Sequence, residues 1–191
     1  IRKAQTAFKG PNIVAAFYAP WQETGLYSLR ENAPRMTHVL PAWVHLSPDG
    51  GNLDLHDFDP QLTPHNNDVL DIAHTNNLSI VPVFSNAQLS DFDQVRAHRM
   101  LTTPALQDRV IFGLLRWVTL NKFQGINIDL EKLAPGDHAL LIPFVQKVRA
   151  AFAPRGLSVS MDLEASAPIS WRRVSAICDF VVVMAYDEHS S

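Results

Sequence analysis

The stretch FQGINIDLE, residues 123–131, decides the fold of this chain. Apolar and polar side chains alternate along it, which predicts a β-strand with Asn127, Asp129 and Glu131 together on one face. In a parallel barrel, the apolar face packs against the surrounding helices and the polar face points toward the axis. Barrel active sites lie at the carboxyl ends of the strands, so we expect Glu131 to lie at the rim of a site. An isolated Asp-x-Glu pair is more often solvated or salt-bridged, so this interpretation depends on the rest of the chain.

The remaining sequence repeats a strand-then-helix unit, which is typical of a parallel sheet. Six strands are predicted, at residues 13–19, 37–46, 78–84, 123–131, 157–163 and 179–186. Helices are predicted at residues 26–32, 67–76, 104–121, 138–152 and 171–176. Pro41 interrupts the second strand and suggests a bulge or a bend. The residues from Ser47 to Asn52 are typical of a hairpin turn, which predicts a small β excursion after that strand.

The six units predict an α/β fold, a (β/α)8 TIM barrel that is incomplete here. A full barrel typically needs about 250 residues, and this sequence has 191. We therefore expect residues 1–191 to form a single barrel domain that is a fragment of a longer chain. The first and last predicted strands are apolar throughout and would have unpaired edges, so we expect edge-mediated self-association and little activity from this chain alone.

Composition narrows the class of protein. A hydrophobic content of 47% with 18% charged residues indicates one globular domain with a real core. The net charge of −3 provides no basic field, so a nucleic-acid partner is not expected. Apolar runs are of strand length only, so no membrane contact is expected. The single cysteine, Cys178, cannot form a disulfide within the chain, and no signal peptide is recognisable in it.

The central stretch resembles the DxxDxDxE signature of glycoside hydrolase family 18, the chitinase-like enzymes, whose common wording is FDGIDIDWE. Gly125, Asp129 and Glu131 match the signature. Gln124 and Asn127 replace its first two aspartates, and a leucine replaces the aromatic residue before the glutamate. Asparagine at the second position is associated with the spore-cortex and polysaccharide-synthase branches of the family.

Two further segments resemble the same family. Residues 184–187 (MAYD) are similar to the MxYD motif at the end of barrel strand six, and they fall on the sixth predicted strand. Phe17-Tyr18 is similar to the GYY or GYF opening of the first strand, with Ala16 in place of its glycine. Ser85-Asn86 closes the third strand where chitinases usually carry SxGG, and looks more like the TNF-type ending of the spore-cortex branch. Two motifs on the expected strands are more specific than either alone.

The resemblance implies a glycosidase that acts on N-acetylglucosamine-containing polysaccharide with retention of configuration and without a cofactor. In this mechanism, the 2-acetamido carbonyl of the sugar attacks its own anomeric carbon. Glu131 would be the general acid, and Asp129 would orient the acetamido N–H and stabilise the oxazolinium cation. Tyr186 would hydrogen-bond the acetyl oxygen, and Asn127 would hydrogen-bond Asp129.

Other residues are expected to bind the substrate, an N-acetylated polysaccharide or oligosaccharide. They are Asp187, Met184, Tyr18 and Glu164, the last on the polar face of the fifth predicted strand. The amino-acid sequences of residues 16–46 and of the MAYDEHSS segment are similar to those of family 18-like domains that are fused to a bacterial polysaccharide deacetylase and a glycosyltransferase. This context implies an extracellular or periplasmic location.

Two other functions remain open from the sequence. A glycan-binding domain with little turnover could assist polysaccharide synthesis or modification, and the substitutions at Gln124 and at the end of strand three favour it. A metal-assisted barrel could use Asp129, Glu131 and Glu164 as ligands. No metal site is predicted among Asp54, His56, Asp57 and Asp59, because their spacing fits no ligand template and a solvated loop explains them better.

Overall fold

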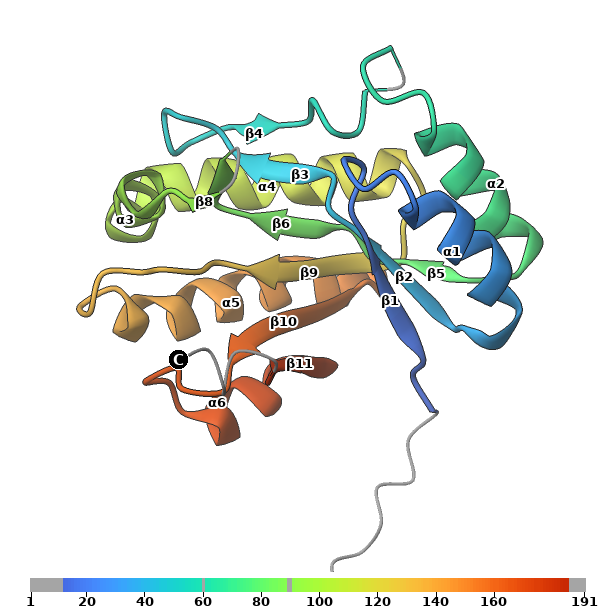
Figure 1. Cartoon of the computed structure of the whole chain (residues 1–191). Helices are drawn as coiled ribbons and strands as arrows, with labels where there is room; N and C mark the ends of the chain where they lie inside the picture. Colours follow the sequence, from blue (N-terminus) through green and yellow to red (C-terminus); the bar gives the residue numbers. More distant parts are fainter. Residues whose placement is uncertain (1–11, 60, 89–90, 186–191) are drawn as a thin grey trace, which may run out of the picture.

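The structure is a computed structural model that describes residues 12–59, 61–88 and 91–185 (Figure 1). Apart from one small hairpin, the described strands form two sheets, with the orders β1-β2-β5 and β11-β10-β9-β6-β3-β4. These strands are β1 (Ala15–Tyr18), β2 (His38–Pro41), β3 (Val44–Leu46), β4 (Leu53–Asp54), β5 (Ser79–Ile80), β6 (Val83–Ser85), β9 (Gly125–Asp129), β10 (Ser158–Glu164) and β11 (Phe180–Met184). Every pair is parallel except β3 with β4, whose antiparallel pairing confirms the predicted β excursion.

The second and third predicted strands are each divided in two. β2 ends at Pro41, which has no N–H for a ladder, and β5 ends at Ile80, two residues before Pro82. Backbone hydrogen bonds continue across both breaks, because Ala42 N–H donates to Tyr18 and Gln124 N–H donates to Ile80. The two sheets are therefore one curved surface of six barrel strands. The predicted strand count and the bend at Pro41 are confirmed.

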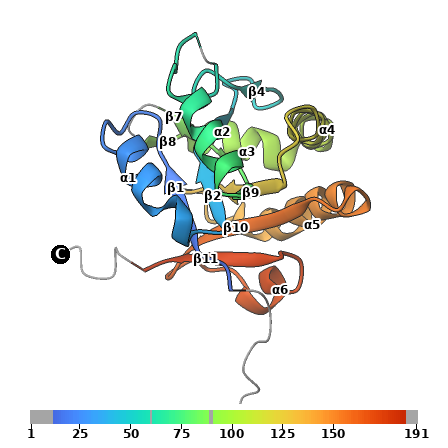
Figure 2. The ribbon, with the colours of Figure 1, turned by 90° about the vertical axis from the view of Figure 1, so that its right-hand side faces the viewer.

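Helices cover the outer face of this surface. They are α1 (Gly25–Asn32), α2 (Asn66–Thr75), α3 (Gln94–Thr102), α4 (Pro104–Leu120), α5 (His138–Phe152) and α6 (Trp171–Ser175), with short 3-10 turns at Ala33–Arg35 and Ala153–Arg155. α4 and α5 lie on one side of β6, β9 and β10, and α1 and α2 lie beside β1 and β2 (Figures 1 and 2). α3 and the hairpin strands β7 (Ala87–Gln88) and β8 (Asp91–Phe92) were not predicted.

The two faces of β9 have opposite environments, as its alternation predicts. Ile126, Ile128 and Leu130 are buried in the main core, together with residues of α4 and α5. Leu40, Val81 and Val83 form a separate small cluster, against which Phe180 packs. Val83 pairs with Asn127 and Phe180 pairs with Ser160 in the sheet register, so this cluster shares the inner face of the sheet with the polar side chains.

Gly125 allows β9 and β10 to approach each other. A Cβ atom at this position would overlap the hydroxyl and the carbonyl oxygen of Ser158, which pairs with Gly125 in the register. A backbone atom cannot move aside as a flexible side chain can. Close packing against Ser158 therefore requires glycine at this position.

The outermost barrel strands have open edges. Over the described ranges, β1 pairs only with β2, and β11 pairs only with β10. Apolar side chains near these edges are exposed, among them Val14, Phe17 and Val183. Of the helices that the structure describes, none has both the length and the apolar character that a membrane span requires.

Candidate active site

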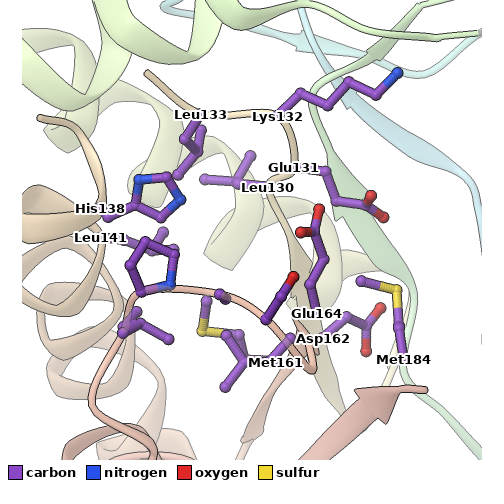
Figure 3. Close-up of a pocket in the computed structure, with 15 residues that line it drawn as sticks. Leu130, Glu131, Lys132, Leu133, His138, Leu141, Met161, Asp162, Glu164 and Met184 are labelled. Carbon is purple, nitrogen blue, oxygen red and sulfur yellow. The ribbon is translucent and has the colours of Figure 1, made fainter. Parts of the chain in front are cut away.

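The carboxyl ends of β9, β10 and β11 line a cavity of about 340 Å³. Figure 3 shows Glu131, Asp162, Glu164 and Met184 gathered on one side of it and Leu133, His138 and Leu141 on the other. Lys132 also lines the cavity, but its side chain extends away from the acidic group (Figure 3). Three carboxylates in one partly enclosed space can supply protons, bind sugar hydroxyl and amide groups, and stabilise a developing positive charge.

Glu131 is held in place through its backbone by Asn86, the residue that follows β6. The Glu131 N–H donates to Asn86 Oδ1 at 3.0 Å, and Asn86 Nδ2 donates to the Glu131 carbonyl at 3.0 Å. The same Nδ2 donates to the carbonyl of Asp93 at 3.1 Å. Asn86 is fully buried, so these bonds form in a low-dielectric environment. The sequence located Asn86 at the end of a strand and gave no sign of this role.

Asp129 lies one inward position below Glu131 and is mostly buried. Burial raises its pKa to about 7, and the negative charges of Asp162 and Glu164 add to this effect. A side-chain hydrogen bond with Glu131 acts in the opposite direction. One carboxylate oxygen of Asp129 is buried without a hydrogen-bond partner among the described residues. The structure therefore brings Asp129 and Glu131 together as predicted.

Asn127 does not make the predicted hydrogen bond to Asp129, and this expectation is wrong. Its Nδ2 donates to Asp162 Oδ2 at 2.7 Å, and its Oδ1 accepts from the Ser160 hydroxyl at 2.6 Å. Both partners lie on β10, where Ser160 is directly opposite Asn127 in the register. The register between β9 and β10 determines these contacts, and this register cannot be predicted from the sequence.

Asp162 was not among the predicted site residues, although it lies on the polar face of the predicted fifth strand. Its side chain is buried, and burial raises its pKa to about 7. The hydrogen bond from Asn127 opposes this rise, whereas the charge of Glu131 contributes to it. Its Oδ1 has no hydrogen-bond partner in the described part of the chain.

The structure brings together two of the four predicted substrate-binding residues. Glu164 and Met184 are register partners on β10 and β11, and both line the cavity. Tyr18 does not join them: it is buried in the main core and lines a separate cavity beside α1. Its placement contradicts the predicted substrate contact, because the alternation of β1 directs Tyr18 to the helix side of the sheet. Tyr186 and Asp187 lie outside the described residues, so their roles stay predictions.

A second polar group lies at the ends of β3 and β6. His45 is buried, with Nδ1 at 2.9 Å from the Ser85 hydroxyl and Nε2 at 2.8 Å from Asp57 Oδ2. His56 contacts both Asp54 and Asp57, so this part of the loop is organised rather than simply solvated. Over the described residues, no group of three or more His, Cys, Asp or Glu side chains is arranged to hold a metal ion.

A comparison with models of protein families identifies the family of this chain. The model of the glycosyl hydrolases family 18 matches residues 13–191, almost the whole chain. The chain belongs to glycosyl hydrolase family 18. The predicted fold is confirmed, since solved structures of this family match 92% of the chain.

Two solved structures and one curated protein illustrate the similarity. A class V chitinase from Pseudomonas fluorescens Pf-5 is 21% identical with a TM-score of 0.81, over 92% of this chain and 54% of its own. The Bacillus cereus spore cortex-lytic enzyme SleL is 23% identical with a TM-score of 0.77, over 92% of this chain and 41% of its own. The uncharacterized glycosylase YvbX of Bacillus subtilis is 28% identical over 114 residues, 54% of this chain and 33% of that protein. The family 18 chain thus spans about half, or less, of the length of these relatives.

Proposed function

We propose that this family 18 chain carries the acid of a retaining glycoside hydrolase that acts on N-acetylglucosamine-containing polysaccharide. The observation that carries the proposal is the position of Glu131. It follows β9 at the carboxyl end of the barrel, Asn86 fixes its backbone at two points, and its side chain lines a cavity with other carboxylates. A proton donor needs a fixed position and access to the substrate, and Glu131 has both.

In the first step, Glu131 donates its proton to the glycosidic oxygen as the bond from that oxygen to the anomeric carbon breaks. The 2-acetamido carbonyl oxygen of the same sugar forms a new bond to the anomeric carbon, giving an oxazolinium cation. Asp129 accepts a hydrogen bond from the acetamido N–H, and its negative charge stabilises the cation. In the second step, water attacks the anomeric carbon as the bond from that carbon to the acetamido oxygen breaks, which regenerates the acetamido group. The water gives a proton to the Glu131 carboxylate, and the two inversions together retain the configuration.

Two observations support an acetamido sugar as the substrate. Alternate residues on a strand are about 6.6 Å apart along it, so Asp129 and Glu131 can contact different parts of one sugar. Several structural relatives are named as chitinases, and chitin is a polymer of N-acetylglucosamine.

A glycan-binding domain with little turnover is the second candidate, and in the sequence alone the substitution at Gln124 favours it. Gln124 Oε1 accepts from the Ile80 N–H at 2.7 Å, and its Nε2 donates to the Lys122 carbonyl at 2.7 Å. The first bond joins the amino end of β9 to β5 and the second is local, and both lie far along the strand from Glu131. The substitution at Gln124 therefore has a structural explanation that leaves the acid intact, which favours the enzyme.

The test is product analysis of the full-length protein on N-acetylglucosamine oligomers of defined length. Mass spectrometry should detect shorter oligomers, and early proton NMR spectra should show products with the anomeric configuration of the substrate. The Glu131→Gln variant is the control for a contaminating hydrolase. Binding of the oligomers without any product would support the glycan-binding domain, and products of inverted configuration would contradict substrate assistance.

The wider context is also a proposal. The similarity to domains fused to a polysaccharide deacetylase and a glycosyltransferase favours a role in the synthesis or modification of a secreted polymer, and hence an extracellular or periplasmic location. Sequencing the complete gene tests whether the domain is fused to a deacetylase or a glycosyltransferase. Cell fractionation, with detection by an antibody against this domain, tests the location.

A further inference from the structure

Asn127 occupies the position at which the family signature has an aspartate, and its own hydrogen bonds fix its orientation. Its oxygen accepts from Ser160 and its nitrogen donates to Asp162, and the side chain is fully buried. An amide neither takes up nor releases a proton in the pH range of enzyme activity. Asn127 therefore cannot share a proton with Asp129, so any shared proton must involve another group.

Asp162 meets the requirements for that group. Ser160 is opposite Asn127 and Met161 is opposite Ile128, and this parallel register continues to place Asp162 level with Asp129. Side chains at paired positions of neighbouring strands project from the same face of a sheet, with the strands about 4.8 Å apart. Asp162 is only 5% exposed, and its Oδ1 has no partner among the described residues. One oxygen of Asp129 is likewise buried and unpartnered there.

Two carboxyl groups in this position resist simultaneous ionisation, because each charge is poorly solvated and repels the other. Among the described residues, the other titratable groups around Asp162 are Glu131, which follows β9, and Glu164 on β10 itself, and both are acidic. The neighbouring residues of β11 are Val182 and Met184, which do not titrate. None of these groups offers a positive charge, so a proton is the available means of neutralising the pair.

We propose that Asp162 is a positioning residue for the hydrolysis described above, and that it supplies from β10 the carboxyl partner with which Asp129 shares one proton. This inference rests on the proposed function. When Asp129 binds the acetamido N–H, the proton resides on Asp162, and the pair carries one negative charge opposite the oxazolinium cation. The proton stays within the pair, and Glu131 alone exchanges a proton with the substrate and with water.

The pair explains how the chain functions without the second aspartate of the signature. Asn127 keeps Asp162 oriented through one hydrogen bond, while the carboxyl that it lacks is present on the adjacent strand. The position of a carboxyl group relative to Asp129 matters more than the strand that carries it. The exchanged variant N127D/D162N, which keeps one carboxyl group beside Asp129, should consequently retain more hydrolytic activity than Asp162→Asn, which loses it.

The first experiment follows the carboxyl carbon of Asp129 by NMR, in full-length protein labelled with 13C at the aspartate side chain. The Asp129→Asn variant assigns the signal. With Asp162→Asn, we expect the pKa of Asp129 to fall by about one unit or more, because a neighbouring charge has been removed. An unchanged titration of Asp129 would overturn the proposal. This experiment needs no activity, so it decides the inference even if the protein hydrolyses no oligomer and the proposed function fails.

The second experiment measures kcat and KM on N-acetylglucosamine oligomers from pH 4 to 9. We expect Asp162→Asn to lower kcat by about 10²-fold with little change in KM and with a shifted pH profile. The exchanged variant N127D/D162N should recover at least about 10-fold of this loss.

The control is Asp179→Asn, whose carboxylate accepts from the Val159 N–H of β10 at 2.9 Å but lies at the opposite end of the strand. We expect this control to keep the parent's kcat. Loss of kcat in Asp162→Asn with an unshifted pH profile, or with no recovery on exchange, would make Asp162 a structural residue only and overturn the proposal.

Discussion

Asn86 binds both backbone polar groups of Glu131, accepting from its N–H and donating to its carbonyl, each at 3.0 Å. This contact joins the end of β6 to the end of β9, where the strands have stopped pairing. Through its bond to Asp93, Asn86 also connects the acid to the residue that caps α3. The position of Glu131 thus depends on a buried amide rather than on the sheet ladder.

Replacing Asn86 should weaken both the fold and the activity. Asn86→Ala leaves three partly buried backbone groups, the N–H and carbonyl of Glu131 and the carbonyl of Asp93, without their side-chain partner. We expect a loss of about 1–3 kcal/mol in the free energy of unfolding. We also expect kcat on N-acetylglucosamine oligomers to fall by about 10-fold or more, since Glu131 loses its fixed position. Urea denaturation and steady-state kinetics measure the two effects.

The matched control for this variant is Asn76→Ala. Asn76 Nδ2 donates to the Ile72 carbonyl at the end of α2, far from the cavity. We expect a modest loss of stability and no loss of kcat in this control. If the Asn86 variant were folded and fully active, Glu131 would be held by other contacts and our interpretation of Asn86 would be wrong.

Asp129→Ala should reduce activity specifically on acetamido sugars. The variant removes the group proposed to orient the acetamido N–H, and we expect kcat to fall by at least about 10²-fold. Stability should change by no more than roughly 1–3 kcal/mol. The comparison uses matched oligomers with and without the N-acetyl group on the reacting sugar. Equal rates of hydrolysis by the parent on both substrates would rule out substrate assistance.

The stability of the protein should decrease as the pH rises from about 4 to above 7. Asp129 and Asp162 have pKa values near 7 in the folded chain, against 3.8 for an ordinary aspartate. In this window, the folded chain holds protons that the unfolded chain has released, so the unfolded state binds fewer protons and the free energy of unfolding falls with pH. We expect the contribution of the pair to be at least about 1 kcal/mol between pH 5 and pH 8.

The measurement is urea denaturation of the parent and of the double variant D129N/D162N at both pH values. The variant should lose less stability than the parent on going to pH 8, because its amides do not titrate. Histidines and other groups titrate in both proteins and cancel in the comparison. An equal loss in both proteins would show that these carboxyls have ordinary pKa values.

The 191-residue chain by itself should self-associate. β1 and β11 each have an unpaired edge over the described residues, and Val183 on β11 is 43% exposed. An exposed apolar edge is a template for pairing with another chain. Size-exclusion chromatography with light scattering should give a mass above that of one chain, and Val183→Lys should lower it. A monodisperse monomer at high concentration would contradict this prediction.

The fold was largely predictable because its signals are local. Alternation along β9 and β10, the periodic apolar positions of α4 and the proline at Pro41 each determine structure within a few residues. α3 was missed because it is short and because its buried face includes the charged Arg96 beside Ala97, Met100 and Leu101. Asp93 was the available signal, since its side chain accepts from the Arg96 N–H at 3.0 Å as a helix N-cap.

The site was only partly predictable, because its contacts cross between strands. Glu131 and Asp129 are marked by their own spacing on one strand. The place of Asp162 in the site depends on the register between β10 and β9. A shift of this register by one residue would turn the Asp162 side chain to the other face of the sheet. Tyr18 was assigned wrongly for the same reason, since the motif was aligned without knowing which residue of β1 faces the interior. Contacts of this kind become visible only in three dimensions.

The most direct test of the account is the kcat of Glu131→Gln, with binding measured in parallel on the same N-acetylglucosamine oligomer. The substitution is nearly isosteric, so the cavity keeps its shape and loses only its proton donor. We predict that kcat of the full-length protein falls by about 10²–10⁴-fold while the Kd measured by calorimetry changes by no more than a few-fold. A variant that retains most of the parent's kcat would place the acid elsewhere and contradict the account.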